Sequence, residues 1–286
     1  MSFQARVRDL PVLGLGVSTE YGAASPETLD VMALRREHPA WGGFLEVGVE
    51  AAKGLDPVAQ AWAQSGWPTT YHFLDVNLDE PEDLDPDWLD SVRELITVLS
   101  PAWLCGDAGL WHFGPRERGS MLLLPPILTD DGATRMAQGI VALREATGLE
   151  VLPENPPGTV FLGDLHLLDF FARVADRADT GLLLDLAHLG IYQQATGRAL
   201  TDGLDHLPRD RVVEVHVAGG LRRDTQGFPW IEDDHTPDVL PETWALYDAL
   251  VPTLPNLKAV VFECERNPLD ACKPGLTRLG QRWSPA

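Results

Sequence analysis

The sequence predicts an α/β fold, namely a single (β/α)8 TIM-type barrel that occupies residues 1–286 as one domain. Short apolar runs alternate with helix-like segments along the chain, a pattern typical of a parallel sheet covered on both faces. There are eight such runs, and the 286 residues lie close to the usual size of this barrel, about 250 residues. No long Ser/Gly linker divides the chain into two parts.

Each apolar run is a candidate strand because it is short and bounded by turn-forming residues. In chain order the predicted strands are Val12–Gly16, Gly43–Val47, Thr69–Phe73, Trp103–Gly106, Leu149–Pro153, Gly181–Asp185, Val212–Val217 and Ala259–Glu263. Two connections are too long for plain turns, namely Asp107–Thr129 and Ala218–Pro241. Loops of such length in a compact domain are usually functional or mobile.

Five segments between the runs begin with the start signals of a helix, which are a capping residue, a proline or acidic residues in the first turn. These starts are Ser25-Pro26-Glu27, Asp85-Pro86, Asp130-Asp131, Gly163-Asp164 and Pro241-Glu242. The alternative to a barrel is a doubly wound open sheet. No glycine-rich phosphate loop supports it, since Gly14 and Gly16 resemble the start of GxGxxG but Thr19 occupies the place of the third glycine.

The charge of the chain narrows the choice of partners. It has 22 Lys and Arg against 43 Asp and Glu, a formal net charge of −21. Such a surface repels phosphate groups and anionic lipid, so we expect neither nucleic acid nor a membrane as a partner. Three cysteines without a CxxC motif, together with the lack of a signal peptide or a long apolar segment, predict a cytoplasmic location.

Polar residues recur at the ends of the predicted strands, where the active site of such a barrel lies. At least seven of the eight strands contribute one. They are Glu46, Glu50, His72, Asp107, Glu154, Asn155, Asp185, His188, Glu214, His216, Glu263 and Glu265. Any single one is explained equally well as a helix cap or a hydrogen-bonded buried group. Together they would repel one another unless a cation lay among them.

The residue types indicate which cation. Imidazole mixed with carboxylate, without a four-cysteine pattern, favours iron, manganese or zinc over calcium. Asp185 and His188 form a DxxH pair that can share one metal or bridge two. Asp233 and His235, in the long connection after the seventh strand, can supply two more ligands, or else belong to an acidic surface loop. A hydrolase that uses two carboxylates, Glu154 and Glu263, would leave the histidines without a role.

Histidine and cysteine residues elsewhere are expected to have structural roles. His112 is interpreted as a packing residue, His166 as part of a helix, and His38 and His206 as surface groups at helix ends. Cys105 and Cys264 are interpreted as small buried thiols.

Five motifs, in order, resemble one family, the multinuclear non-heme iron-dependent oxidative enzymes typified by MbnB. They are LEVLPENPPG around Glu154, GLLLDLAHLGIY around Asp185, VVEVHVAGG around His216, EDDHTPDV around His235 and VVFECERN around Glu263. FLEVGVE at residues 44–50 resembles the second strand of that family, and the resemblance extends over roughly residues 10–267.

The resemblance implies a xylose-isomerase-like TIM barrel with two or three iron ions. It implies that O2 is used to modify a Cys or Asp residue of a ribosomally made precursor peptide, which a partner protein commonly presents. By position, the implied metal ligands are His72, Glu154, Asp185, His188, His216, Asp233, His235 and Glu263. Asn155 and Asp107 are further catalytic candidates, and Arg222 and Arg223 could pair with a peptide carboxylate, or be two solvated arginines.

The chain departs from the family pattern at two ligand positions. Gly106-Asp107-Ala108 occupies the place of a Ser-Glu-His motif, and Gly48 occupies that of a histidine on the second strand. Three functions therefore remain open. The first is an iron-dependent oxidative enzyme acting on a peptide. The second is a redox-neutral metal enzyme of the isomerase or endonuclease type, and the third is a non-catalytic protein that binds a metal or a peptide.

Overall fold

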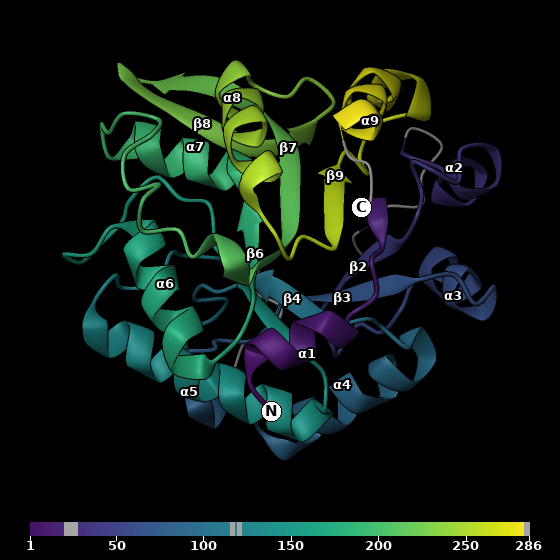
Figure 1. The fold of residues 1–286 in the computed structure, drawn as a ribbon, viewed down its shortest axis with the longest axis horizontal. Helices are drawn as coiled ribbons and strands as arrows, with labels where there is room; N and C mark the ends of the chain where they lie inside the picture. The colour runs from purple at the N-terminus through teal and green to yellow at the C-terminus, as the bar shows by residue number, and fades with distance from the viewer. Residues whose placement is uncertain (20–27, 115–117, 119–121, 283–286) are drawn as a thin grey trace.

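The computed structural model describes residues 1–19, 28–114, 118 and 122–282. In these residues, eight parallel strands form a closed barrel in which each barrel strand pairs with the next one, and the last, β9 (Ala259–Glu263), pairs with the first, β1 (Gly14–Thr19). Helices surround this barrel on the outside (Figure 1). The predicted (β/α)8 barrel is thereby confirmed. None of the helices in the described part of the chain is long and apolar enough to cross a membrane.

The strands match the predicted runs with small shifts. They are β1 (Gly14–Thr19), β2 (Leu45–Val49), β3 (Thr69–Phe73), β4 (Leu104–Asp107), β5 (Val151–Glu154), β6 (Leu182–Asp185), β7 (Val212–Thr225), β8 (Phe228–Thr236) and β9 (Ala259–Glu263). The first strand begins two residues later than predicted because Gly14 is the first residue that pairs with β9, whereas Val12 is exposed. It also ends later, at Thr19 instead of Gly16, so it extends further toward the carboxyl end of the barrel than the apolar run does.

The helices lie between the strands. They are α1 (Phe3–Asp9), α2 (Val31–Glu37), α3 (Pro57–Gln64), α4 (Pro86–Leu99), α5 (Asp130–Thr147), α6 (Leu167–Ala178), α7 (Leu186–Ala195), α8 (Pro241–Leu250) and α9 (Leu269–Arg282), with short 3-10 turns at Pro81–Asp83, Arg209–Arg211 and Val251–Thr253. The predicted start at Ser25 lies outside the described residues, and α2 is capped by Asp30.

One predicted helix start is wrong by a few residues. Helix α6 begins at Leu167 and not at Gly163-Asp164. His166, which was expected inside the helix, is its N-cap, and its side chain accepts a hydrogen bond from the backbone amide of Leu168. An imidazole nitrogen here replaces the usual carboxylate or hydroxyl oxygen as cap acceptor.

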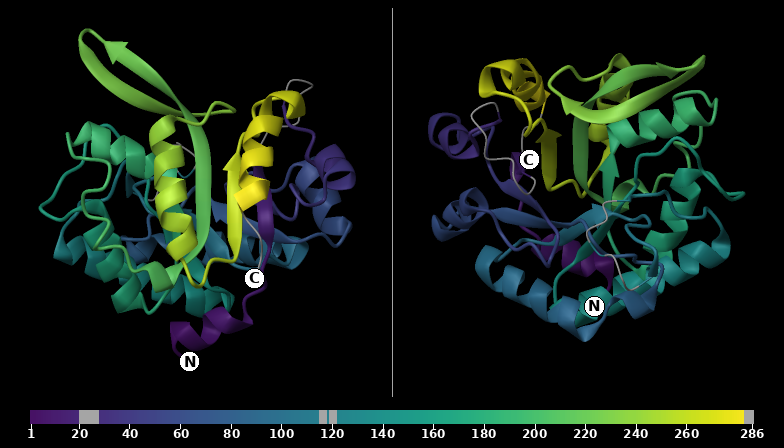
Figure 2. Two further views of the ribbon diagram at one scale, coloured as in Figure 1. Left: turned by 45° about the horizontal axis from the view of Figure 1, so that its top comes forward. Right: turned by 180° about the vertical axis from the view of Figure 1, so that it is seen from behind.

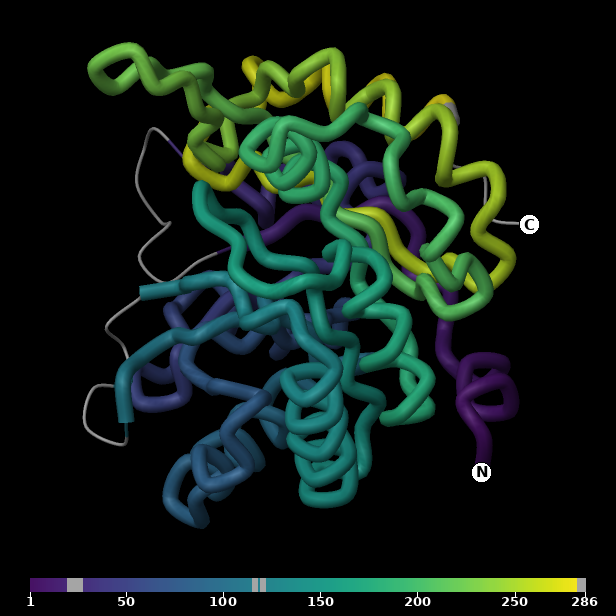
Figure 3. Tube along the Cα trace, turned by 90° about the vertical axis from the view of Figure 1, so that its left-hand side faces the viewer, coloured from purple at the N-terminus to yellow at the C-terminus, as the bar shows by residue number. Residues whose placement is uncertain are grey.

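Helix α1, which the apolar pattern did not predict, closes the amino-terminal end of the barrel. Its buried side chains Phe3 and Val7 pack in one cluster with Trp103 and with inward-facing residues of the strands. The views in Figures 1 and 2 place this helix at the end of the molecule opposite the β7–β8 hairpin, and the tube in Figure 3 shows the same separation. Helix α1 therefore fills the amino-terminal end of the barrel with apolar side chains.

This plug leads to a test of stability. Phe3 is fully buried, so we expect Phe3→Ala to lower the free energy of unfolding by about 3–5 kcal/mol through lost burial and the cavity it leaves. Phe113→Ala is the matched control, because that ring is 71% exposed and should cost little. Urea denaturation of both variants measures the difference. Equal stabilities would mean that α1 does not contribute to the core.

The segment 218–241, predicted as a long loop, is instead largely a β-hairpin. Strand β7 continues beyond the barrel and pairs antiparallel with β8 (Figure 2). The two residues at its tip, Gln226 and Gly227, have φ of 55° and 86°. Positive φ at both central residues is the geometry of the tight turns that join antiparallel strands. The sequence signal for this turn was Gly227 at its tip.

Candidate metal centre

Strand geometry aims a ring of polar side chains into the barrel mouth. Successive side chains alternate between the two faces of a strand, so the residues that precede or follow an outward apolar residue point inward. The pairing register sets inward-facing residues side by side, with Asp107 opposite Glu154 and Asp185 opposite His216. His72 on β3 and Glu263 on β9 complete this ring. All six are buried, with exposed fractions of 7% or less.

Three further predicted ligands come from other elements. Asp185 caps α7 by accepting a hydrogen bond from the backbone amide of His188 at 2.6 Å, which places that imidazole one turn above the strand. Asp233 and His235 lie on β8 of the hairpin, and Asp233 approaches His188 at 3.0 Å. The hairpin therefore folds back over the barrel mouth, which Asp233 and His235 need in order to reach a metal there.

A distorted stretch of β8 brings His235 to the mouth. The pairing with β7 shifts between Gly219 and Gly220, so that Asp234 and His235 are skipped, and His235 has φ of 52°. A non-glycine residue in this left-handed region costs roughly 1–2 kcal/mol. Gly219 permits the close crossing, since a Cβ there would collide with the backbone of Thr236. Such bulges are frequent beside active sites, where they redirect a side chain.

The mouth encloses a cavity of about 190 Å³, roughly the volume of six water molecules. Five predicted ligands line it, namely His72, His188, Asp233, His235 and Glu263, whereas Glu154, Asp185 and His216 are buried and do not line it. The lining residues are Ser18, Thr19, Glu46, Gly48, His72, Leu74, Asp107, Trp111, Leu123, His188, Asp233, His235, Glu263 and Arg266. The space suits metal ions together with one side chain of a substrate, and not a large free ligand.

Glu154 is at the centre of the cluster. Its Oε2 lies 2.9 Å from His72 Nε2, and its Oε1 lies 3.4 Å from His188 Nδ1 and 3.5 Å from His216 Nδ1. Oε1 is buried and has no hydrogen-bond partner. A carboxylate that faces three imidazoles in this way is placed to bridge metal ions.

Acceptors outside the cluster orient two of the imidazoles. His235 Nδ1 lies 2.7 Å from Glu265 Oε1, and Ser18 in turn donates to the other oxygen of that carboxylate. His188 Nδ1 lies 2.9 Å from the carbonyl oxygen of Asn155. Each of these acceptors favours a proton on the nearby nitrogen, so Nε2 is the nitrogen of each ring that would bind a metal, and in both rings it faces Asp233. This arrangement is usual for histidines that bind metals.

The buried charges are distributed unevenly. Burial, together with the charges of Glu263 and Glu154, raises the pKa of Asp185 to about 7, and burial with Glu154 also raises the pKa of Asp107. Burial acts against the charged form of His72, but its hydrogen bond to Glu154 raises the pKa of this imidazole to about 9. Protons thus offset the excess of carboxylates in the metal-free cluster, and a divalent cation would displace them.

Several oxygen and nitrogen atoms in the cluster lack hydrogen-bond partners. Besides Glu154 Oε1 they are Asp107 Oδ1, Asp185 Oδ2, His216 Nδ1 and Nε2, Asp233 Oδ1 and Glu263 Oε2. Unpaired buried polar atoms are rare and costly, so their convergence needs an explanation. Three groups could hold an ion, each with its ligand atoms within 4.8 Å of one another: His72, Asp107 and Glu154; Glu154, Asp185 and His188; and Glu46, His216 and Glu263. The residues present therefore fit a centre of more than one metal ion.

Two residues near the centre were not among the predicted ligands. Glu46 Oε1 lies 3.1 Å from His216 Nε2, and Glu265 holds His235. Both belong to the strand-end carboxylates of the sequence, which was the available signal. Their contacts with particular histidines depend on neighbours that are distant along the chain.

Other candidates lie away from the cavity lining. The Asn155 amide donates to the carbonyl oxygen of Asp185 and accepts from its amide, so this side chain joins the ends of β5 and β6. Arg222 pairs with Glu242, and Arg223 pairs with Glu232 at 2.6 Å, both on exposed surface. Among the described residues, Arg266 is the arginine that lines the cavity, and it lies 3.7 Å from Glu265.

The remaining histidines have structural partners. His112 is buried and lies 3.0 Å from Asp83 and 2.7 Å from the Gly114 carbonyl oxygen, as expected of a packing residue. His38 is the C-cap of α2. The cysteines Cys105 and Cys264 are buried free thiols.

Fold and cluster together define a class, that of TIM-barrel proteins with a carboxylate and histidine cluster suited to metal ions at the carboxyl ends of the strands. The family described as "RiPP precursor modification enzyme MbnB/TglH/ChrH" matches residues 26–271. The chain belongs to this family, whose members modify ribosomally synthesised precursor peptides. The resemblance stated from the five motifs is thus confirmed.

Two curated relatives are 26% and 28% identical to this chain, and their names state no function. A UPF0276 protein of Caulobacter vibrioides is 28% identical over 247 residues, which cover 84% of this chain and 83% of that protein. A UPF0276 protein of Rhizobium meliloti is 26% identical over 216 residues, covering 73% and 69%. The similarity in both cases extends over most of each chain.

Solved structures confirm the type of barrel. Endonuclease IV from Thermus thermophilus has a TM-score of 0.54 at 15% identity, covering 94% of this chain and 97% of its own. A xylose isomerase domain containing protein from Salmonella typhimurium has a TM-score of 0.52 at 10% identity, covering 93% of each. The 3-keto-D-glucoside 4-epimerase YcjR from E. coli has a TM-score of 0.52 at 16% identity, covering 93% and 99%. These likenesses establish a xylose-isomerase-like fold and nothing about the reaction.

Proposed function

We propose that the chain is a non-heme iron enzyme that holds two or three iron ions and uses O2 to modify a Cys or Asp residue of a ribosomally made precursor peptide. Membership of the peptide-modifying family supports the class of substrate. The observation that carries the metal assignment is the convergence of unpaired buried oxygens with three imidazoles that lie within 3.5 Å of Glu154.

The donor set favours iron, manganese or zinc over calcium and magnesium, and the resemblance to iron-dependent enzymes selects iron. Imidazole and carboxylate ligands with open positions are typical of non-heme iron centres, whereas calcium and magnesium prefer oxygen alone. Iron, when bound, would supply the electrons needed to reduce O2. The ligand residues would be His72, Glu154, Asp185, His188, His216, Asp233, His235 and Glu263, with Glu154 bridging. The departures at Gly48 and Ala108 remove two imidazoles, and Glu46 adds a carboxylate near His216.

Residues of the chain would limit the access of water, move a proton, attract the peptide and position a ligand. The hairpin covers one side of the mouth and so limits the access of water to the ions. Asp107 lines the cavity, where its carboxyl group would accept or release a proton beside the reacting substrate. Arg266 at the mouth is placed to attract a peptide carboxylate. Asn155 positions Asp185 through both of its backbone groups.

The direct test is to purify the protein without oxygen from iron-replete cells and to measure its metals. We expect iron in excess of one ion per chain, coupled iron centres in the Mössbauer spectrum, and O2 consumption when a precursor peptide encoded beside the gene is added. Mass spectrometry of the peptide then identifies the modified residue. A protein that binds zinc or manganese under every condition and consumes no O2 would contradict the oxidative reaction and favour redox-neutral chemistry.

We also propose that a partner protein presents the peptide. Exposed apolar side chains on the loops after β4 and β5 support this proposal, namely Leu124, Ile127, Val160 and Leu162. The backbone hydrogen bond from Leu128 to Leu162 shows that the two loops run together. Co-expression with proteins encoded nearby, followed by size-exclusion chromatography, tests whether a stable complex forms. If peptide modification proceeds at full rate with this chain alone, no presenting partner is needed.

A further inference from the structure

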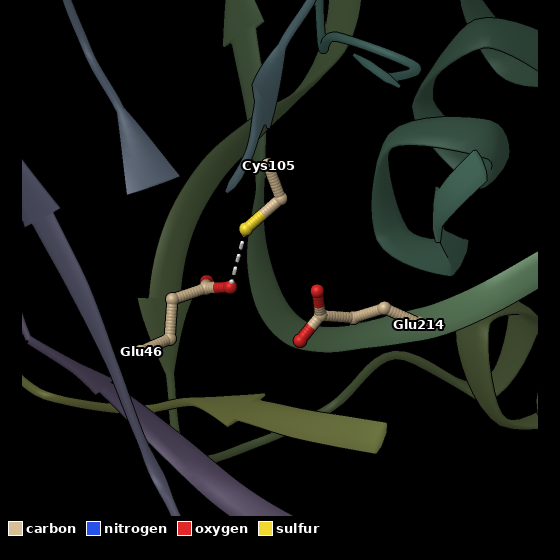
Figure 4. A group of neighbouring side chains, drawn as sticks. All are labelled: Glu46, Cys105 and Glu214. Carbon is tan, nitrogen blue, oxygen red and sulfur yellow. Dashed lines mark hydrogen bonds between the residues drawn. The ribbon is translucent and has the colours of Figure 1, made fainter. Parts of the chain in front are cut away.

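A second layer of buried ligand groups lies beneath the ring of Glu154. Glu46 of β2, Cys105 of β4 and Glu214 of β7 point toward one another inside the barrel (Figure 4). Each has an exposed fraction of 1% or less. One ligand atom from each residue lies within 4.8 Å of those of the other two.

Hydrogen bonds satisfy only some of the polar atoms in this layer. The Cys105 thiol donates to Glu46 Oε2 at 3.1 Å, and the Thr70 hydroxyl donates to the same oxygen at 3.2 Å. The Trp103 indole donates to Glu214 Oε2 at 2.7 Å. Glu214 Oε1, in contrast, is fully buried without a partner.

The surroundings offer little positive charge. Below the layer lie apolar side chains, including Phe3, Leu152 and Val261. In the described part of the chain, His216 is the single ion-pair partner of Glu46, and Glu214 has none. Two carboxylates in such a place require either a shared proton or a bound cation, because an uncompensated buried charge is very costly.

We propose that Glu46, Cys105 and Glu214 form an additional metal site below the main centre, which binds a divalent transition metal of the zinc or ferrous iron class. A thiolate with two carboxylates selects these ions over magnesium and calcium. An ion whose bonds to these three residues are about 2.0–2.3 Å long draws the donors closer together than the 4.8 Å limit, so the three side chains would rotate slightly to bind it. The Cys105 thiol proton leaves as the metal–sulfur bond forms.

The site goes beyond the proposed function, because it does not depend on iron or O2 at the main centre. Glu46 connects the two levels, since one of its oxygens faces Cys105 and the other faces His216. An ion held there would also fix Glu46 against His216. The eight ligands proposed for the main centre include no thiol, so a metal–thiolate signal reports on the lower site.

The experiment uses the whole chain, stripped of metal and reconstituted with Co²⁺ without oxygen. We expect the near-ultraviolet charge-transfer absorption of a cobalt–thiolate bond in the parent protein. Cys105→Ala should lose this absorption together with one cobalt ion per chain, and Glu214→Gln should weaken it. Cys272→Ala is the matched control, because this thiol is equally buried but lies on α9 outside the barrel, and it should behave like the parent.

The proposal fails if the parent binds Co²⁺ without a thiolate absorption, since Glu46 and Glu214 would then share a proton. It also fails if the absorption disappears in Cys272→Ala but persists in Cys105→Ala. If Cys105→Ala does not fold, Glu214→Gln and Cys272→Ala decide the question, because the proposal requires a weaker absorption in the first and an unchanged one in the second. If the protein shows the absorption but never uses O2, the lower site stands and the proposed function is wrong. If the protein is an active iron enzyme without the absorption, the proposed function stands and the lower site is wrong.

Discussion

Glu154→Gln is expected to lose most of the bound metal while keeping its fold. Glu154 lies within 3.5 Å of His72, His188 and His216, so a neutral amide removes the charge and the bridge at the point shared by the whole cluster. Loss of such a ligand should weaken metal binding by on the order of 100-fold or more, above the 10–100-fold typical of outer partners. Metal analysis after dialysis against a weak chelator measures this effect.

The metal-free form of the same variant separates binding from folding. Glutamine has nearly the size of glutamate, so we expect the metal-free variant and the metal-free parent to unfold within a few degrees of each other. Glu232→Gln is the control, because that carboxylate lies on the exposed hairpin and pairs with Arg223. If Glu154→Gln retained the full metal content of the parent, the bridging role would be wrong.

His235→Ala should remove one metal ion and most of the O2 consumption while leaving the ions held by Asp185, His216 and Glu263. His235 reaches the cavity only through the hairpin, and its Nε2 faces Asp233 at 3.3 Å. Asp233→Asn should have a similar effect, since Asp233 contacts both His188 and His235. Metal stoichiometry and O2 uptake are measured side by side for each variant.

Adjacent residues on β8 supply a strict control for this prediction. Asp234 neighbours both ligands in sequence but is absent from the cavity lining, so Asp234→Asn should bind metal and consume O2 like the parent. An unchanged metal count and an unchanged turnover in His235→Ala would show that the hairpin residues are not part of the centre. Equal losses in Asp233→Asn and Asp234→Asn would indicate a general effect of hairpin charge.

The barrel and much of its ring of polar residues could be predicted from the chain because both depend on local regularities. A strand exposes alternate side chains to opposite faces, and the carboxyl ends of parallel strands meet at one rim. A carboxylate or imidazole at the end of an apolar run is thereby directed to the mouth. His72, Asp107, Glu154, Asp185, His216 and Glu263 were placed correctly for this reason, although their roles as ligands stay predictions.

Long-range contacts decided the remaining features. The plug by α1, the crossing of the hairpin and the left-handed conformation of His235 depend on packing against distant segments. Arg222 and Arg223 were candidates for binding substrate, but the fold brings Glu242 and Glu232 beside them and leaves Arg266 at the cavity.

The same distinction holds for the layer of Glu46, Cys105 and Glu214. The sequence by itself determined that these residues lie on strands and that Glu46 and Glu214 are carboxylates in apolar runs. Only the tertiary structure determined that they meet, because three strands far apart in the chain must close into a barrel before their inward side chains share one level. The physical reason is that strand periodicity is local, whereas the distance between two inward side chains is set by barrel closure and register.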